Sequence, residues 1–209
     1  LVGQRQTPGC IHPRWVVLAL ASTMVIGNFY VYDTPSALKE QLESRFIRAG
    51  SSKDNFEYLF GLLYSAYSVP NILLPFLGGT FVDRVGTSTA LVLFSALILG
   101  GQVLFTLGVQ ADQLWLMLLG RAVYGLGGDN LTIAQSTVVA RWFDGQELAF
   151  ALGITVSISR LGSVFNNSIS PYLAANSGGV AFALWFGAIL CAACMSLIFI
   201  LMLVERRYK

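Results

Sequence analysis

The stretch LGSVFNNSISPYLAANSGGVAFALWFGAILCAACMSLIFILMLV, residues 161–204, contains no Asp, Glu, Lys, Arg or His. Residues 58–82 and 85–111 also lack these ionisable side chains. A run of about 18 or more mostly apolar residues is typical of a helix that crosses a lipid bilayer. A soluble chain of 209 residues could not bury so many such runs, so the sequence predicts an integral protein of the lipid bilayer.

The bulk composition indicates the same environment. Apolar residues make up 55% of the chain and charged residues 11%, whereas about 25% of residues are charged in a typical soluble domain. Inside hydrocarbon every backbone polar group needs an internal partner, so a crossing segment is a helix or a strand of a closed barrel. The apolar runs lack the two-residue alternation of barrel strands, and we therefore predict an all-α membrane protein.

Six segments fit a transmembrane helix of about 20 residues. They are residues 15–32, 58–77, 87–109, 114–139, 148–173 and 182–204, and residues 176–179 (NSGG) separate the last two. Because the chain starts at Leu1 rather than Met and ends directly after a span, we expect it to be part of a longer protein. Residues 1–209 would then form one six-helix transmembrane bundle.

The basic residues predict the orientation of this bundle, because loops rich in Lys and Arg stay in the cytoplasm. An even number of crossings places both termini on one side. That side would hold Arg5, Arg14, Arg84, Arg141, Arg206, Arg207 and Lys209, and the other side Lys39, Arg45, Arg48 and Lys53. Both termini are therefore predicted to be cytoplasmic. The longest connection, residues 34–57, is predicted to start with an amphipathic surface helix that has Pro35 near its first turn.

Three ionisable residues lie deep inside the predicted spans: Arg121, Asp129 and Arg160. A charge at the bilayer centre costs at least about 2.5–3.5 kcal/mol, so such residues face a protein interior or a water-filled cavity. Asp129 and Arg160 both fall within about 3 Å of the midplane, on sequential spans that we expect to be neighbours. They are the first candidates for a functional site.

Two roles for Asp129 and Arg160 stay open. They could form a buried ion pair that locks two helices, or a divided site for a zwitterion. In the second role Arg160 would hold a carboxylate with its planar guanidinium group, and Asp129 would hold an ammonium group. The two roles are compatible, because a substrate could separate the pair.

Other polar groups complete the set of candidates. Arg121 lies roughly 9 Å from the midplane on the non-cytoplasmic side, and we expect Asp33 to pair with it in a structural or gating contact. The polar and aromatic residues Asn28, Tyr30, Tyr64 and Asn166 are candidate substrate contacts, although such residues also join helices to one another.

A short segment between the second and third spans, GTFVDRVG (residues 79–86), resembles the loop signature of the major facilitator superfamily. Arg121 and Gly125 resemble a second pattern of that superfamily. The resemblance implies a six-helix N-terminal half with a C-terminal half missing, and substrate held between the two halves. It also implies gating or structural roles for Gly79, Asp83, Arg84 and Gly86.

Four segments narrow the resemblance to the lysosomal dipeptide uniporter family. They are residues 27–39 (GNFYVYDTPSALK), 63–71 (LYSAYSVPN), 120–135 (which end in GLGGDNLTIAQ) and 157–166 (SISRLGSVFN). This resemblance implies that Asp129 and Arg160 contact the amino and carboxyl ends of a dipeptide, although animal members carry Glu at the position of Asp129. It further implies a lysosomal or vacuolar membrane, with the plasma membrane as the alternative, and an accessory glycoprotein subunit.

We therefore expect a transporter that works by alternating access and exports dipeptides or similar zwitterionic substrates. The alternatives are a proton-coupled sugar or organic-anion transporter, in which Asp129 would take up a proton, and a non-transporting membrane scaffold. The sequence argues against an enzyme, because its single His, His12, lies outside the spans. We expect no cofactor, no metal and no nucleic acid partner.

Overall fold

The computed structural model describes residues 13–48, 50 and 52–208, apart from the side chains of residues 73–78 and 208. Arg5, His12 and Lys209 lie outside this range. The described residues form eight helices and no strand, which confirms the predicted all-helical class. The helices are α1 (Pro13–Thr23), α2 (Ile26–Ala37), α3 (Lys39–Arg48), α4 (Lys53–Val85), α5 (Thr87–Gln110), α6 (Leu114–Trp142), α7 (Gly145–Asn176) and α8 (Gly179–Tyr208).

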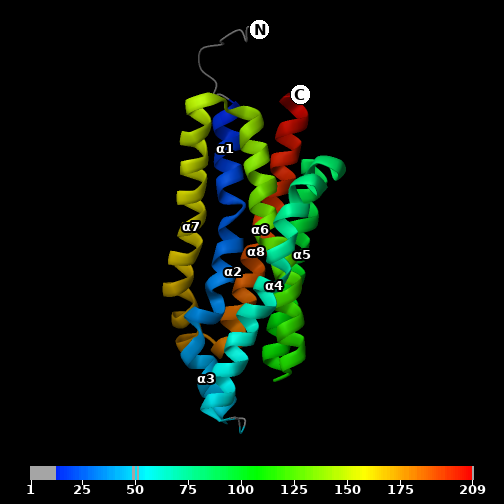
Figure 1. Ribbon diagram of the computed structural model, residues 1–209. Coiled ribbons are helices and arrows are strands. Elements are labelled where there is room, and N and C mark those ends of the chain that lie inside the picture. The colour runs from blue at the N-terminus through cyan, green and yellow to red at the C-terminus, as the bar shows by residue number, and fades with distance from the viewer. Residues whose placement is uncertain (1–12, 49, 51, 209) are drawn as a thin grey trace.

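The long helices run up and down in one elongated bundle (Figure 1). Helices α1 and α2 follow one another in one direction, and α4 to α8 then alternate in direction, so the described ends of the chain lie at the same end of the bundle. Four stretches, residues 13–37, 87–110, 145–176 and 179–207, are long and apolar enough to cross a membrane. Helices α4 and α6 are 33 and 29 residues long.

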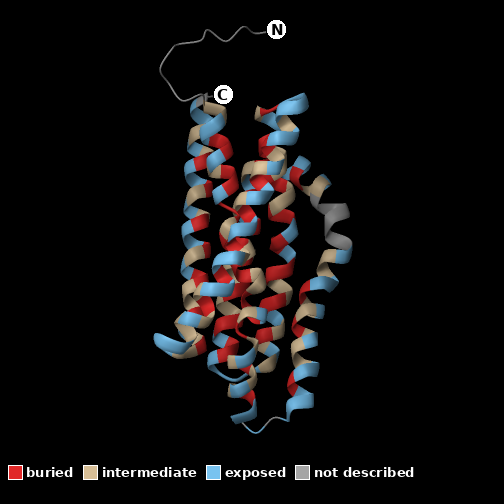
Figure 2. Ribbon diagram, turned by 90° about the vertical axis from the view of Figure 1, so that its left-hand side faces the viewer, coloured by how far each residue is buried: buried red, intermediate tan, exposed pale blue. Residues whose placement is uncertain are grey.

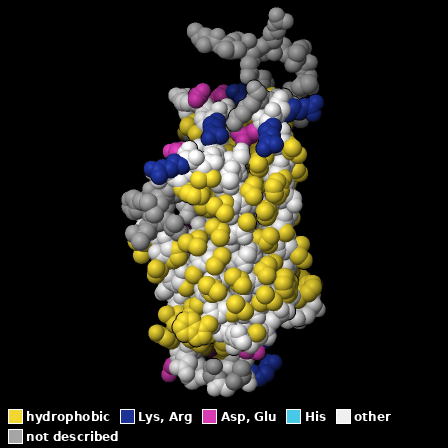
Figure 3. All heavy atoms as spheres, turned by 90° about the vertical axis from the view of Figure 1, so that its right-hand side faces the viewer, with side chains coloured by type: hydrophobic (Ala, Val, Ile, Leu, Met, Phe, Trp, Pro, Cys, Tyr) yellow, Lys and Arg dark blue, Asp and Glu magenta, His cyan; other side chains and the backbone are white. Residues whose placement is uncertain are grey.

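The surface of the bundle matches a bilayer. On the face seen in Figure 3, hydrophobic side chains form a broad band, and the Lys, Arg, Asp and Glu side chains gather at the two ends. Buried residues lie mostly on the helix surfaces that face the interior of the bundle, as Figure 2 shows. This distribution is expected when apolar lipid tails, rather than water, surround the middle of the protein.

Close helix packing explains the many glycines of α5 and α6. A Cβ atom added at Gly101 would lie 2.5 Å from the backbone nitrogen of Tyr124, and one added at Gly120 would lie 2.5 Å from that of Phe105. Small residues therefore bring α5 and α6 into backbone contact, as is common between membrane helices. Gly127 packs on the carbonyl oxygen of Phe94 in the same way.

The helix ends have local causes. Ser52 caps α4, because its hydroxyl oxygen accepts a hydrogen bond from the backbone nitrogen of Asn55 (3.3 Å). Gly86 has φ +89° between α4 and α5, a conformation that favours glycine. Pro35 lies inside α2 rather than at the start of the amphipathic helix, which is α3 and begins at Lys39.

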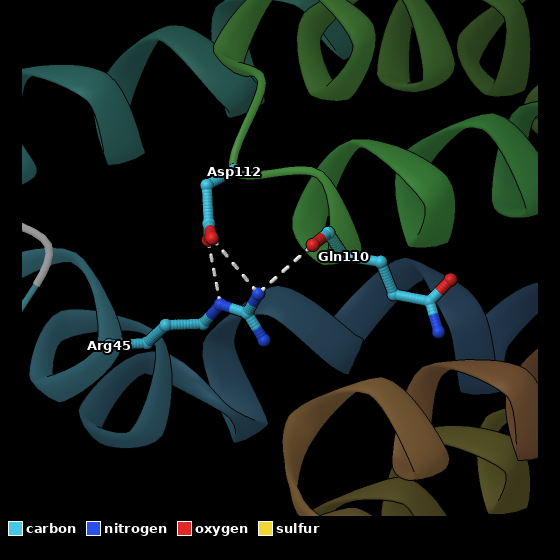
Figure 4. A network of polar contacts seen from close by, with 3 residues as sticks. All are labelled: Arg45, Gln110 and Asp112. Carbon is cyan, nitrogen blue, oxygen red and sulfur yellow. Dashed lines mark hydrogen bonds and ion pairs between the residues drawn. The ribbon is translucent and has the colours of Figure 1, made fainter.

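Helix α3 is fastened to the turn between α5 and α6. The guanidinium group of Arg45 donates hydrogen bonds to both carboxylate oxygens of Asp112, at 2.7 and 3.2 Å, and to the backbone oxygen of Gln110 at 3.2 Å (Figure 4). On its other face α3 buries Leu42 and Phe46. The helix predicted at the start of the long connection is therefore packed on the bundle.

Candidate functional site

An open groove of about 670 Å³ lies between α6 and α7, with α2 behind it. It is lined by Phe29 of α2, by Asp129, Thr132, Ile133, Ser136, Thr137 and Ala140 of α6, and by Leu152 and Arg160 of α7. The groove thus offers one anionic group, one cationic group, three hydroxyl groups and several apolar side chains. A small polar molecule with opposite charges at its two ends would find a partner for each end here.

Asp129 is exposed to the groove and held from behind by Tyr67 of α4. The Tyr67 hydroxyl donates a hydrogen bond of 3.0 Å to Oδ1 of Asp129. The ring of Tyr67 is buried between two other tyrosines, with ring centres 5.1 Å from Tyr32 and 5.6 Å from Tyr124. The carboxylate therefore has one oriented partner within the protein and an open side toward the groove.

Arg160 is exposed on α7, with the carbon of its guanidinium group 4.5 Å from the centre of the Phe29 ring. Among the described residues, the ion pairs within 4.0 Å join other residues, and neither Arg160 nor Asp129 takes part in one. The direct ion pair between Asp129 and Arg160, one of the two predicted roles, is therefore not formed in this structure. Both charges are available to a ligand.

The expectation that the spans of Asp129 and Arg160 pack as direct neighbours is wrong for most of their length. Helix α7 packs mainly on α2 and α8, whereas α6 packs mainly on α5 and α4. A short loop joins α6 to α7, but α1 and α2 pack on α7, and the two helices form opposite walls of the groove. This separation is the reason that the two charges do not neutralise each other directly.

Three of the other candidate residues lie in the interior between helices rather than on the groove wall. Asn28 donates to the backbone oxygen of Gly128 (3.1 Å), and its side-chain oxygen accepts from Tyr124 (2.7 Å). The hydroxyl groups of Tyr30 and Ser170 are 2.9 Å apart, and Ser170 in turn donates to Asn166. Asn28, Tyr30 and Asn166 therefore join α2 to α6 and α7, and their contact with a substrate stays a prediction.

Tyr64 and Arg121 meet at a second, much smaller cavity of about 10 Å³, which is also lined by Tyr32 and Tyr67. Arg121 is 3% exposed and lies over the rings of Phe105 and Tyr124, at 4.5 and 5.4 Å. The expected partner Asp33 forms no ion pair with it in the described part of the chain. The guanidinium group instead makes long contacts of 3.4 Å to the backbone oxygen of Val31.

The residues of the signature segment lie at the end of α4. Asp83 and Arg84 are exposed in the last turn of this helix, beyond Gly79 and before the turn at Gly86. A contact that the sequence did not predict joins α6 to the start of α5 here, because Arg141 donates a hydrogen bond to the hydroxyl of Thr87. Gating or structural roles for Gly79, Asp83, Arg84 and Gly86 stay predictions.

Sequence reasoning missed the two side chains that hold the charged pair, Tyr67 and Phe29. Tyr67 could have been found, because it lies at the middle of the predicted span 58–77, at the same depth as Asp129 and Arg160. No sequence signal indicates Phe29, because its contact with Arg160 depends on how α2 and α7 pack. Within the described residues, no group of three or more His, Cys, Asp or Glu could hold a metal ion.

The profile of the Major Facilitator Superfamily matches residues 16–209. Because this match covers most of its length, the chain belongs to the Major Facilitator Superfamily, whose members are membrane transporters rather than enzymes. The family predicted from the signature segments is thereby confirmed.

Curated relatives narrow the comparison. The chain is 40% identical over 167 residues to the lysosomal dipeptide transporter MFSD1 of Mus musculus and 38% identical over 167 residues to that of Homo sapiens, with 79% of this chain and 34% of each relative covered. It is 31% identical over 119 residues to the probable anion transporter 4, chloroplastic, of Arabidopsis thaliana, with 56% of this chain and 22% of that protein covered. The chain spans about a third of the length of the MFSD1 relatives.

Proposed function

We propose that this chain forms the N-terminal six-helix bundle of a transporter that facilitates the export of dipeptides or similar zwitterions. The observation that carries the proposal is that Asp129 and Arg160 line one open groove without pairing with each other. The similarity to the lysosomal dipeptide transporter MFSD1 of two mammals supports the same substrate class.

The chemistry of the groove fits the two ends of a dipeptide. A guanidinium group can donate two parallel hydrogen bonds to a carboxylate, and a carboxylate accepts readily from an ammonium group. Consecutive Cα atoms are about 3.8 Å apart, so the charged ends of an extended dipeptide need two protein charges that are separated rather than paired. Arg160 would hold the carboxyl end and Asp129 the amino end, with Thr132 and Ser136 beside them.

The proposal includes six membrane crossings, formed by α1 with α2 and by α4 to α8. The alternating helix directions and the band of hydrophobic side chains support this arrangement (Figures 1 and 3). In this superfamily two such bundles enclose the substrate and rock against each other to open the site to either side of the membrane. A C-terminal half would therefore cover the groove, and residues 1–209 alone would bind substrate weakly and not transport it.

We further propose that both termini are cytoplasmic, because the end of the bundle that holds them carries the larger number of basic residues. The similarity to lysosomal relatives supports a lysosomal or vacuolar membrane. An accessory glycoprotein subunit would then bind at the opposite, luminal end, where α3 and the turns between α5 and α6 and between α7 and α8 lie.

Dipeptide uptake into proteoliposomes tests this function, with the full-length protein that contains this chain. The wild type should transport dipeptides with or without a pH gradient, and Asp129→Asn and Arg160→Ala should each reduce uptake by at least ten-fold. If collapse of the gradient abolished uptake, the proton-coupled alternative would replace facilitated transport. If no dipeptide, sugar or organic anion crossed the membrane, the scaffold alternative would be favoured.

A further inference from the structure

Tyr67 touches Asp129 but not the groove. Its hydroxyl donates to Oδ1 of Asp129 over 3.0 Å, and its side chain is not among those that line the groove. Tyr67 is also 9% exposed, whereas Asp129 is exposed. Any effect of Tyr67 on a ligand in the groove must therefore pass through the carboxylate of Asp129.

The direction of the Tyr67 hydroxyl is set by its surroundings. Its ring lies edge-on to Tyr32 (5.1 Å, 65°) and tilted against Tyr124 (5.6 Å, 35°). Tyr124 is itself fixed, because its hydroxyl donates to the backbone and side-chain oxygens of Asn28 at 2.8 and 2.7 Å. A buried ring with fixed neighbours on two sides has little freedom to turn away from Asp129.

Two glycines of α6 allow this approach. A Cβ atom at Gly125 would lie 2.6 Å from the carbonyl oxygen of Tyr67, so the missing side chain lets α4 pack directly against α6. A Cβ atom at Gly128 would lie 3.4 Å from the Tyr67 hydroxyl. The segment GLGGD, residues 125–129, therefore provides the carboxylate and also the space for its hydrogen-bond donor.

We infer that Tyr67 is a positioning residue that orients Asp129 and thereby sets the selectivity of the groove for substrates with a free amino group. This inference rests on the proposed function. The hydrogen bond to Oδ1 fixes the plane of the carboxylate and leaves Oδ2 free to accept from an ammonium group. Without the bond the carboxylate rotates more freely, and ordering it on binding costs part of the affinity.

The test compares Tyr67→Phe, which removes only the hydroxyl and keeps the ring, with Tyr58→Phe in the full-length protein. Tyr58 is a suitable control because it lies on the same helix and is 69% exposed. Uptake kinetics are measured for a free dipeptide, and inhibition of that uptake is measured for the same dipeptide with an acetylated amino group. Melting temperatures establish that both variants fold.

Tyr67→Phe should raise the KM for the free dipeptide by about ten-fold, since hydrogen bonds to charged groups contribute substantially to binding, while the maximal rate changes by less than about two-fold. Its inhibition constant for the acetylated dipeptide should equal that of the wild type. In an Asp129→Asn background the same change should have little further effect, because both substitutions act on one interaction.

Several outcomes would overturn the inference alone: equal kinetics for Tyr67→Phe and Tyr58→Phe, the same loss of affinity for free and acetylated dipeptides, or additive effects with Asp129→Asn. If Tyr67→Phe failed to fold, Tyr67 would be shown to act on the fold rather than on selectivity. A wild type without dipeptide transport would overturn the proposed function, and this inference with it.

Discussion

The guanidinium carbon of Arg160 lies 4.5 Å from the centre of the Phe29 ring, so a cation of α7 rests on an aromatic side chain of α2. A guanidinium group in this position is attracted to the face of the ring by about 0.5–1 kcal/mol at an exposed site. The contact leaves the planar edge of Arg160, with its N–H donors, free for a carboxylate. Phe29 thus holds the cation of the groove as Tyr67 holds the anion.

Replacing the ring should therefore weaken carboxylate binding. We expect Phe29→Leu to raise the KM for dipeptide uptake by about two- to five-fold, which corresponds to the attraction between cation and ring that is lost. Phe165→Leu is the matched control, because Phe165 lies on α7 and is 48% exposed. Equal KM values for both variants would show that Phe29 does not orient Arg160.

Gly125 should be intolerant of a side chain, because α4 and α6 touch there. Gly125→Ala places a Cβ atom 2.6 Å from the Tyr67 carbonyl oxygen, and overpacking of this kind costs about 1–3 kcal/mol. We expect a lower melting temperature and a raised KM, since Tyr67 would be displaced from Asp129. Gly153→Ala, at a helical position with nothing within 4 Å, should leave both unchanged or raise stability slightly. A Gly125→Ala protein as stable as Gly153→Ala would contradict this packing.

The contact between Arg45 and Asp112 predicts a loss of stability in acid. The hydrogen bonds from Arg45 lower the pKa of Asp112 below its ordinary value. Because the pKa is lower in the folded than in the unfolded state, the stabilisation is complete above the unfolded pKa of about 3.9 and is lost as the pH falls through the folded pKa. The effect is small, below about 1 kcal/mol, because both side chains are partly exposed.

Thermal melting of the full-length protein between about pH 6 and pH 3 checks this prediction. Asp112→Asn should remove the part of the acid sensitivity that Arg45 causes, and it is a mild change because Asn tolerates the backbone of Asp112, which has φ +52°. Arg45→Gln should have the same effect, and the double variant should add nothing. Independent, additive losses would mean that the two residues do not act as a pair.

Arg121 should behave as an unpaired buried cation. A buried ion can often be replaced by an apolar side chain of similar size without loss of stability. We expect Arg121→Met to leave the melting temperature equal or higher, and Asp33→Asn to have no coupling with it, because no ion pair joins these two described residues. A coupling energy of about 1 kcal/mol or more in a double-mutant cycle would restore the predicted pair of Arg121 and Asp33.

The helices were predictable from the apolar runs, but their ends were not. Helix α4 starts at Lys53, before the expected Tyr58, because Ser52 caps it and charged residues are tolerated where a helix extends beyond the lipid. The first expected span is divided into α1 and α2 at Met24 and Val25, and no turn residue announces this break. Apolar length predicts that a helix exists, whereas its ends depend on caps and on tertiary packing.

The candidate site was predictable in part for a similar reason. The cost of a charge in lipid selects Asp129 and Arg160 from the sequence alone. Depth along a helix does not reveal which way a side chain faces, so it could not distinguish Asn28 and Asn166, which face other helices, from the hydroxyl groups of Thr132 and Ser136 in the groove. Pairing between helices, such as that of Tyr67 with Asp129, emerges only once the bundle is assembled.

The central claim is that Asp129 and Arg160 each hold one end of a zwitterion. The most direct measurement is competition for uptake by three forms of one dipeptide, free, N-acetylated and C-amidated, in the wild type, Asp129→Asn and Arg160→Ala. We predict that Asp129→Asn loses only the preference for the free amino group and that Arg160→Ala loses only the preference for the free carboxylate. If both variants kept both preferences, or lost both equally, the division of roles between the two residues would be contradicted.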